Sequence, residues 1–216
     1  MRFDRVLWDL DGTLTDPKAG ITRSVRYALT RLGHPAPEED LLEWVIGPPL
    51  VASFRLLLGT EDENLLRQAV EVYRERFVAK GMFENTVYPG IPELLADLEA
   101  AGAQLLVVTS KPRVFAEKIL EHFQLRSFFR RVIGSELDGS RTDKEELVGE
   151  ALRGLPFSAR AQTAMVGDRS FDVQGARRNG IASIFVRYGY GQPDEAERSG
   201  PDYEVGSVEE LRSLLL

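Results

Sequence analysis

The sequence predicts an α/β fold: a doubly wound parallel sheet with a small all-helical domain inserted after the first strand. Two observations predict the sheet: short apolar runs alternate with helical patterns along most of the chain, and several of these runs end in polar residues. Strands that alternate with helices form parallel sheets through right-handed crossovers. The insertion is predicted by a third observation, a long stretch near the N-terminus that has no strand pattern.

The expected elements follow one another in order along the chain. Apolar runs predict strands at residues 6–8, 104–109, 131–134, 164–166 and 183–186. Helical patterns predict helices between them at residues 91–101, 116–123, 144–152 and 173–178. Each strand run is short and is bounded by turn residues, which is typical of buried strands in parallel sheets.

The segment before the second strand is expected to be a helical domain. Apolar residues recur there at helical spacing, in residues 21–32, 41–46, 51–58 and 65–78. Turns rich in glycine and proline separate these stretches. We therefore predict an α/β core formed by residues 1–15 and 85–216, and an insertion of residues 16–84 that is long enough for a small bundle.

The composition describes an ordinary globular protein and excludes several kinds of site. There are no cysteines, which excludes disulfides, thiolate zinc sites and a cysteine nucleophile. The only two histidines, His34 and His122, argue against a histidine-rich metal site or a histidine-based triad, because each is expected to be structural or solvated. A net charge of −7 gives no reason to expect a nucleic acid as partner. Without a signal segment or a long apolar run, we expect a cytoplasmic protein that does not bind membranes. The oligomeric state stays open.

The most informative feature is a pair of carboxylates, Asp9 and Asp11, directly after the first strand. Ligands of open parallel sheets bind beyond the carboxyl ends of the strands, so both side chains are expected at one site. Their mutual repulsion is a cost that is explained if they hold a cation or divide nucleophilic and proton-transfer roles. For the pair alone, a solvated turn is the alternative, since Asp and Gly are common turn residues.

Further strand ends carry polar residues, and a parallel sheet brings all of these ends to one edge. They supply Thr109 and Ser110, then Lys144 at a helix start, and Asp168 with Asp172. Carboxylates can hold Mg²⁺, while hydroxyl, N–H and ammonium groups neutralise the oxygens of a phosphoryl group. One of the paired aspartates could attack phosphorus. The set therefore predicts Mg²⁺-dependent phosphoryl chemistry.

In this order, the motifs resemble the four motifs of the haloacid dehalogenase-like superfamily. The stretches that carry the resemblance are residues 9–15, Thr109-Ser110, Lys144, and Gly167-Asp168 with Asp172. The insertion lies where that family places its helical C1 cap domain. Residues 47–50, 109–112 and 134–139 further resemble the phosphoglycolate phosphatase-like branch. Dehalogenase members lack the second aspartate of the first motif, which is present here, so the resemblance implies a phosphatase.

The resemblance implies a role for each of these residues. Asp9 would be the nucleophile and a metal ligand. Asp11 would act as general acid and base and would offer its backbone carbonyl to the metal. Thr109, Ser110 and Lys144 would bind the phosphate. The implied reaction is hydrolysis of a small phosphate monoester with Mg²⁺, through an aspartyl phosphate, while the cap closes over the substrate.

Asp168 would complete the metal shell, and Asp172 would bind the metal or support its ligands. Asp172 could equally serve as a charge at a helix N-terminus. The remaining cations near the site and in the insertion are expected to be mostly solvated: Lys111, Arg169, Arg23, Arg55 and Arg74. Residues 188–191, Tyr-Gly-Tyr-Gly, are expected to form a loop beside the site with no assigned chemistry.

The sequence leaves the substrate and several functions open. Phosphoglycolate is implied by the branch resemblance alone, and a 5′-nucleotidase or another sugar-phosphate phosphatase fits the same core chemistry. A phosphomutase of the same fold would transfer the phosphoryl group to a sugar instead of water. A signalling module that accepts phosphate on aspartate is disfavoured by the helical insertion after the first strand. A non-catalytic phosphate-binding protein is disfavoured by the complete set of charged residues.

Overall fold

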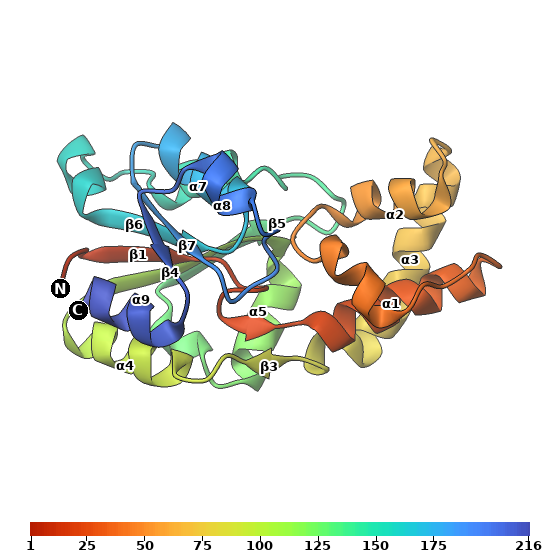
Figure 1. Cartoon of the computed structure of the whole chain (residues 1–216), viewed down its shortest axis with the longest axis horizontal. Helices are drawn as coiled ribbons and strands as arrows, with labels where there is room; N and C mark the ends of the chain where they lie inside the picture. Colours follow the sequence, from red (N-terminus) through yellow and green to blue (C-terminus); the bar gives the residue numbers. More distant parts are fainter. The chain divides into compact units, whose positions relative to one another are not determined.

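The computed structural model describes residues 1–216 and divides them into two compact units (Figure 1). Unit 1 is formed by Met1–Asp16 and Val87–Leu216, and unit 2 by Pro17–Thr86. The chain passes between the units through β2 (Thr15–Asp16) and β3 (Thr86–Val87), which pair with each other. That unit 2 works as a cap stays a prediction.

Unit 1 is built on a six-stranded sheet of order β5-β4-β1-β6-β7-β8, in which every neighbouring pair is parallel. Its strands are β1 (Arg5–Trp8), β4 (Gln104–Pro112), β5 (Arg131–Ser135), β6 (Thr163–Gly167), β7 (Ala182–Val186) and β8 (Tyr203–Val205). The chain runs from β1 to β4 and β5 on one side and returns to β6 on the other. Ligands of open α/β sheets bind at the carboxyl ends of the strands beside such a reversal.

Helices cover both faces of this sheet, with α7 and α8 on one side and α4 and α9 on the other (Figure 1). The helices of unit 1 are α4 (Ile91–Ala100), α5 (Arg113–His122), α6 (Lys144–Ala151), α7 (Ser170–Arg178), α8 (Glu195–Ser199) and α9 (Val208–Leu215), with 3₁₀ turns η3 (Arg126–Phe128) and η4 (Phe157–Gln162). A buried cluster joins Leu7 of β1 and Val108 of β4 to Leu147 and Val148 of α6. The predicted doubly wound α/β fold is confirmed.

Unit 2 is helical. Its elements are α1 (Lys18–Arg31), the 3₁₀ helix η1 (Glu39–Val45), α2 (Leu50–Leu58), α3 (Glu63–Ala79) and the 3₁₀ turn η2 (Gly81–Phe83). Helix α1 packs against α3, and the aromatic rings of Tyr73 and Phe77 stack along α3. A Cβ at Gly20 would lie 1.9 Å from the carbonyl oxygen of Gly81, so this close approach of α1 to η2 requires glycine.

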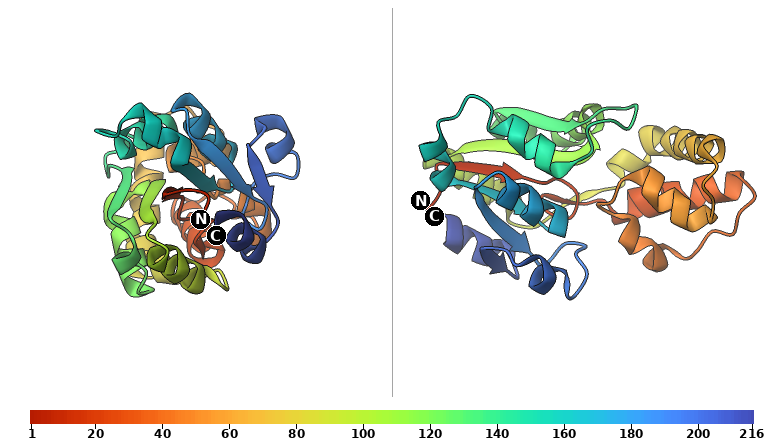
Figure 2. Two further views of the ribbon diagram at one scale, coloured as in Figure 1. Left: turned by 90° about the vertical axis from the view of Figure 1, so that its left-hand side faces the viewer. Right: turned by 90° about the horizontal axis from the view of Figure 1, so that it is seen from above.

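The C-terminal part of unit 1 contains elements that the sequence did not predict: α8, β8 and α9. Strand β8 is three residues long and lies at the edge of the sheet, so it has no apolar run to mark it. Helix α9 has an ordinary start signal, because the side chain of Ser207 accepts from the N–H of Glu210 at 3.1 Å. It ends beside the N-terminus (Figure 2), where the N–H of Arg2 donates to the carbonyl oxygen of Leu215 at 2.9 Å.

None of the helices is both long enough and apolar enough to cross a membrane. The longest helix, α3, has 17 residues, and only one stripe of them is buried. The cytoplasmic location stays a prediction.

Leu7→Ala is expected to lower the free energy of unfolding by about 2–5 kcal/mol, because the lost side chain leaves a cavity. Leu7 is fully buried and belongs to the cluster described above. As a control, Leu137→Ala truncates a leucine that is 44% exposed in the loop before α6, and its effect should stay within about 0.5 kcal/mol. Urea denaturation followed by circular dichroism measures both changes. Equal effects of the two substitutions would contradict this account of the core.

Candidate active site

Asp9 follows β1 directly, and its carboxylate is buried at the carboxyl edge of the sheet. Its backbone N–H donates to the carbonyl oxygen of Val166 at 2.9 Å, which continues the parallel pairing of β1 with β6. Asp9 Oδ1 accepts from the N–H of Leu10 at 2.8 Å and lies 3.0 Å from Lys144 Nζ. Both contacts are to Oδ1, so Oδ2 takes no hydrogen bond from the protein.

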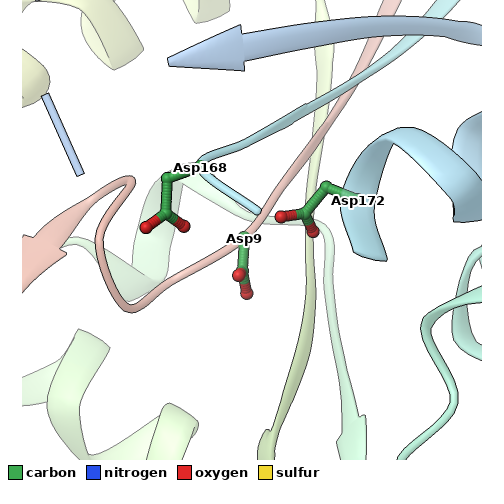
Figure 3. Close-up of side chains that lie close together, drawn as sticks. All are labelled: Asp9, Asp168 and Asp172. Carbon is green, nitrogen blue, oxygen red and sulfur yellow. The ribbon is translucent and has the colours of Figure 1, made fainter. Parts of the chain in front are cut away.

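Asp168 and Asp172 bring two more buried carboxylates to Asp9 (Figure 3). Asp168 follows β6 and Asp172 lies in the first turn of α7, and one carboxylate oxygen from each of the three residues lies within 4.8 Å of the others. Burial, and then the charges of Asp9 and Asp172, raise the pKa of Asp168 well above its ordinary value. Burial also raises the pKa of Asp172, against the opposing charge of Lys144. A cation bound here would relieve this repulsion.

Lys144 is the cation that the fold places among these carboxylates. It is the first residue of α6, which is capped by the side chain of Asp143. Lys144 Nζ lies 2.8 Å from Asp172 Oδ1 and 3.0 Å from Asp9 Oδ1, and it donates to the carbonyl oxygen of Val108 at 3.0 Å. Burial by itself lowers the pKa of Lys144, but the two carboxylates outweigh it and raise the pKa. The buried side chain is therefore an ammonium at neutral pH.

The two carboxylate oxygens of Asp172 have different surroundings, and only Oδ2 accepts a hydrogen bond from the protein. Its Oδ1 faces Lys144, and its Oδ2 accepts from the backbone N–H of Arg169 at 3.2 Å, which caps the start of α7. The side chain thus combines two of the readings that the sequence left open: it lies within the acidic cluster, and it is a charge at a helix N-terminus.

Asp11, two residues after Asp9, pairs with Lys111. Lys111 Nζ lies 2.5 Å from Asp11 Oδ2, and the two side chains are 7% and 12% exposed. Burial raises the pKa of Asp11, while the ammonium of Lys111 opposes the rise. Oδ1 of Asp11 is buried without a hydrogen-bond partner. A carboxyl group with a raised pKa is suited to donate a proton near neutral pH and to take one back.

Thr109 and Ser110 lie near the end of β4, next to β1. The register pairs Trp8 with Val107, which sets Thr109 beside the turn that begins at Asp9. The Thr109 hydroxyl accepts from the N–H of Lys111 at 3.2 Å, and Ser110 Oγ donates to the carbonyl oxygen of Thr142 at 3.1 Å. Neither hydroxyl contacts the three aspartates, so the structure places this pair beside the cluster and not within it.

Two cations expected to be solvated are buried. Lys111 pairs with Asp11, as described above, and Arg169 is 8% exposed, with its Nε 3.2 Å from the carboxylate of Glu195. The expectation is wrong because each cation has an acidic partner that is distant in the sequence. In unit 2, Arg23 and Arg55 pair with glutamates and keep partly exposed side chains, and Arg74 is half-buried.

Sequence reasoning missed the contact that the loop of residues 188–192 makes with the acidic cluster. The N–H of Tyr190 donates to Asp168 Oδ2 at 2.7 Å, and Thr13 Oγ1 donates to Asp168 Oδ1 at 3.4 Å. The hydroxyl of Tyr188 donates to the carbonyl oxygen of Thr13 at 3.0 Å. The sequence contained one indication of this contact: a glycine stands on either side of Tyr190, and glycine allows the backbone to approach a site closely.

The family model described as haloacid dehalogenase-like hydrolase matches residues 6–186, which is most of the chain. The chain belongs to this family. A solved structure of a predicted phosphatase from Clostridium acetobutylicum is 42% identical, with a TM-score of 0.92 and coverage of 100% of this chain and 99% of that chain. The hydrolase family implied by the four motifs is thus confirmed.

Named relatives of this haloacid dehalogenase-like chain differ in activity. A 5′-nucleotidase of Pseudomonas aeruginosa is 47% identical over 100% of this chain and 96% of its own length. The tyrosine-protein kinase PtkA of Mycobacterium tuberculosis is 40% identical over 97% and 72%, and a phosphoglycolate phosphatase of Pseudomonas savastanoi pv. phaseolicola is 31% identical over 95% and 77%. The family match, the phosphatase structure and the relatives named 5′-nucleotidase and phosphoglycolate phosphatase identify the chain as a phosphatase of this family and leave its substrate open.

The donor set fits a hard divalent cation. The three clustered candidate ligands are carboxylate oxygens, which such cations prefer, and they follow two adjacent strands and lie at one helix start. Burial, and then the charges of Asp9 and Asp172, raise the pKa of Asp168, and a cation bound beside these carboxylates would reduce their repulsion.

Asp168→Asn is expected to stabilise the metal-free protein, because an amide removes one of three repelling charges and can still accept from Tyr190. The raised pKa means that folding favours protonated Asp168. The ionised carboxylate of Asp168 destabilises the fold. This effect is absent below the pKa of about 3.9 that the group has in the unfolded chain, and it grows as the pH rises above that value. The Tm of Asp168→Asn should therefore exceed that of the wild type by more at about pH 8 than at about pH 5. Each kcal/mol of relieved repulsion should raise the Tm by roughly 2–4 °C.

Thermal unfolding in EDTA measures this difference for variant and wild type side by side. Mg²⁺ should then raise the Tm of the wild type more than that of the variant. A variant that is less stable than the wild type at both pH values would contradict the repulsion argument.

Proposed function

We propose that the protein is a Mg²⁺-dependent phosphatase that hydrolyses a small phosphate monoester in two steps, through an aspartyl phosphate on Asp9. The observation that carries the proposal is the environment of the Asp9 carboxylate. Lys144 and the N–H of Leu10 hold Oδ1, Oδ2 takes no hydrogen bond, and Asp168 lies beside it. A carboxylate held in this way is oriented and has one oxygen available to attack phosphorus.

In the first step Asp9 Oδ2 attacks the phosphorus atom, and the bond between phosphorus and the leaving oxygen breaks. The ammonium of Lys144, the Thr109 hydroxyl and the Ser110 N–H neutralise charge on the phosphoryl oxygens. Asp9, Asp168 and the backbone carbonyl of Asp11 would hold Mg²⁺, with Asp172 keeping Lys144 in place. When bound, Mg²⁺ supplies further neutralisation of the phosphoryl group.

Asp11 moves the proton in both steps. Its protonated form gives a proton to the leaving alkoxide, and the resulting carboxylate takes a proton from the water that attacks phospho-Asp9. Inorganic phosphate leaves and the Asp9 carboxylate is restored. The pKa of Asp11, which burial raises, supports the first role, and the opposing charge of Lys111 supports the return to the ionised form.

As substrate class we propose 5′-nucleotides, because the relative that is 47% identical over the whole chain is named a 5′-nucleotidase. Phosphoglycolate is the second candidate, supported by the relative of that name and by the motif resemblance. Unit 2 would act as the lid that excludes water and selects the substrate. A phosphate-release panel with both substrate classes decides between them, and an assay for sugar-phosphate interconversion tests the phosphomutase alternative.

Asp9→Asn is expected to abolish turnover, since an amide is not a nucleophile towards phosphorus. Asp11→Asn should lower kcat by about 10²–10⁴-fold, the usual contribution of a general acid and base. Asp4→Asn is the matched control, because Asp4 is an exposed aspartate at the opposite end of β1. Release of phosphate from a generic aryl phosphate measures all three. Near wild-type activity of Asp9→Asn would rule out Asp9 as the nucleophile.

Chelation by EDTA is expected to silence the enzyme, and added Mg²⁺ should restore it. Ca²⁺ should restore much less activity, since it takes about 6–8 ligands at longer distances than Mg²⁺ and fits a compact carboxylate site poorly. The same phosphate-release assay measures the recovery at matched concentrations of each ion. Activity that survives exhaustive chelation would remove the metal from the proposal.

A further inference from the structure

The 188–192 loop contacts both segments that carry the proposed metal ligands. On one side, the N–H of Tyr190 donates to Asp168 Oδ2 at 2.7 Å. On the other side, the hydroxyl of Tyr188 donates to the carbonyl oxygen of Thr13 at 3.0 Å, and the hydroxyl of Tyr190 donates to the carboxylate of Asp16. Thr13 lies in the turn that begins at Asp9, and Asp16 lies in β2, which follows that turn directly. The loop therefore joins the turn after β1 to the turn after β6.

The loop packs against Asp168 so closely that side chains do not fit between them. A Cβ at Gly189 would lie 2.3 Å from the carbonyl oxygen of Gly12 and 2.5 Å from Asp168 Oδ2. A Cβ at Gly191 would lie 2.3 Å from the carbonyl oxygen of Asp168. From the other loop, a Cβ at Gly12 would lie 2.1 Å from Asp168 Oδ2. The position of the Asp168 carboxylate is therefore set by the backbone of both neighbouring loops.

Glu195, the first residue of α8, joins the 188–192 loop to the turn after Asp168. Its side chain is buried, and Oε1 accepts from the N–H of Ser170 at 2.6 Å while Oε2 accepts from the N–H of Gln192 at 2.9 Å. Arg169 Nε lies 3.2 Å from both oxygens. Burial raises the pKa of Glu195, but these N–H groups and the charge of Arg169 outweigh burial and lower it. The carboxylate is therefore ionised at neutral pH.

We propose that Glu195 is a positioning residue for the metal site, because its carboxylate fixes the 188–192 loop on the turn that carries Asp168. The inference rests on the proposed function, in which Asp168 binds Mg²⁺. Without the negative charge, Arg169 loses its ion pair with Glu195, and the N–H groups of Ser170 and Gln192 lose the charged acceptor that they share. Asp168 then loses part of the support that holds its carboxylate beside Asp9. Residues that orient metal ligands in this way typically contribute about 10–100-fold to metal affinity.

Glu195→Gln is the direct test, with Glu197→Gln as its control. Glu197 lies in the same short helix, but its side chain is 61% exposed and pairs with Arg187 at the surface. Calorimetric titration of Mg²⁺ into the metal-free, full-length protein, without substrate, gives the dissociation constant of each variant. We expect Glu195→Gln to weaken Mg²⁺ binding by about 10–100-fold and Glu197→Gln to leave it unchanged. At saturating Mg²⁺, kcat of Glu195→Gln should approach the wild-type value, because Glu195 touches neither Asp9 nor Asp11.

The outcomes separate this inference from the proposed function. A lower Tm of Glu195→Gln with an unchanged Mg²⁺ dissociation constant would show a purely structural role and overturn the inference alone. No Mg²⁺ binding by the wild type would overturn the proposed function and the inference with it. Should Glu195→Gln not fold, Glu195→Asp carries the test, because its shorter side chain cannot reach the Ser170 and Gln192 donors together. An unchanged Mg²⁺ affinity of that variant would equally overturn the inference.

Discussion

The repulsion among three buried carboxylates is the constraint on which the rest of unit 1 depends. Asp9, Asp168 and Asp172 come within 4.8 Å of one another in a place that water does not reach easily. Lys144 offsets part of this charge, because its Nζ lies 2.8 Å from Asp172 Oδ1 and 3.0 Å from Asp9 Oδ1. Lys144 Nζ also donates to the carbonyl oxygen of Val108 in β4. One ammonium does not balance three carboxylates, so the cluster keeps uncompensated negative charge. This charge makes the cluster suitable for a divalent cation and, through the cation, for a phosphoryl group.

The sheet makes this arrangement possible because its strand order reverses at β1. The neighbours of β1 are β4 and β6, so the residues that follow all three strands meet at one edge without long loops. The backbone then supports the side chains: Asp9 continues the pairing with β6, and Asp172 caps α7. Asp11 is paired with Lys111 at the same edge, so the proposed nucleophile, Asp9, and the proposed proton donor, Asp11, have different electrostatic surroundings although only one residue lies between them. Such a division suits a reaction that needs one ionised and one protonated aspartate.

The sequence was sufficient to predict the parts of the structure that follow from regular patterns of apolar residues or from the geometry of parallel sheets. Alternation of apolar runs and helical patterns predicts the doubly wound sheet, and the meeting of parallel strand ends predicts that Asp9, Lys144 and Asp168 converge. The structure bears out this convergence, whereas the chemical roles remain proposals. The burial of Lys111 was not predictable, because its partner Asp11 is 100 residues away and nothing local marks the pair. The same holds for Glu195, whose contacts depend on the path of the 188–192 loop. Strand β8 was missed since it is short and pairs on one side only.

The central claim is that the Asp9 carboxylate itself receives the phosphoryl group, and reductive trapping tests it most directly. Enzyme quenched with borohydride during turnover of a 5′-nucleotide should carry homoserine at position 9, because borohydride reduces an acyl phosphate and leaves free carboxylates unchanged. Peptide mass mapping locates the modified residue. The account predicts reduction at Asp9 that depends on both Mg²⁺ and substrate. Reduction at another aspartate, or none under conditions in which the intermediate of a comparable phosphatase is trapped, would contradict it.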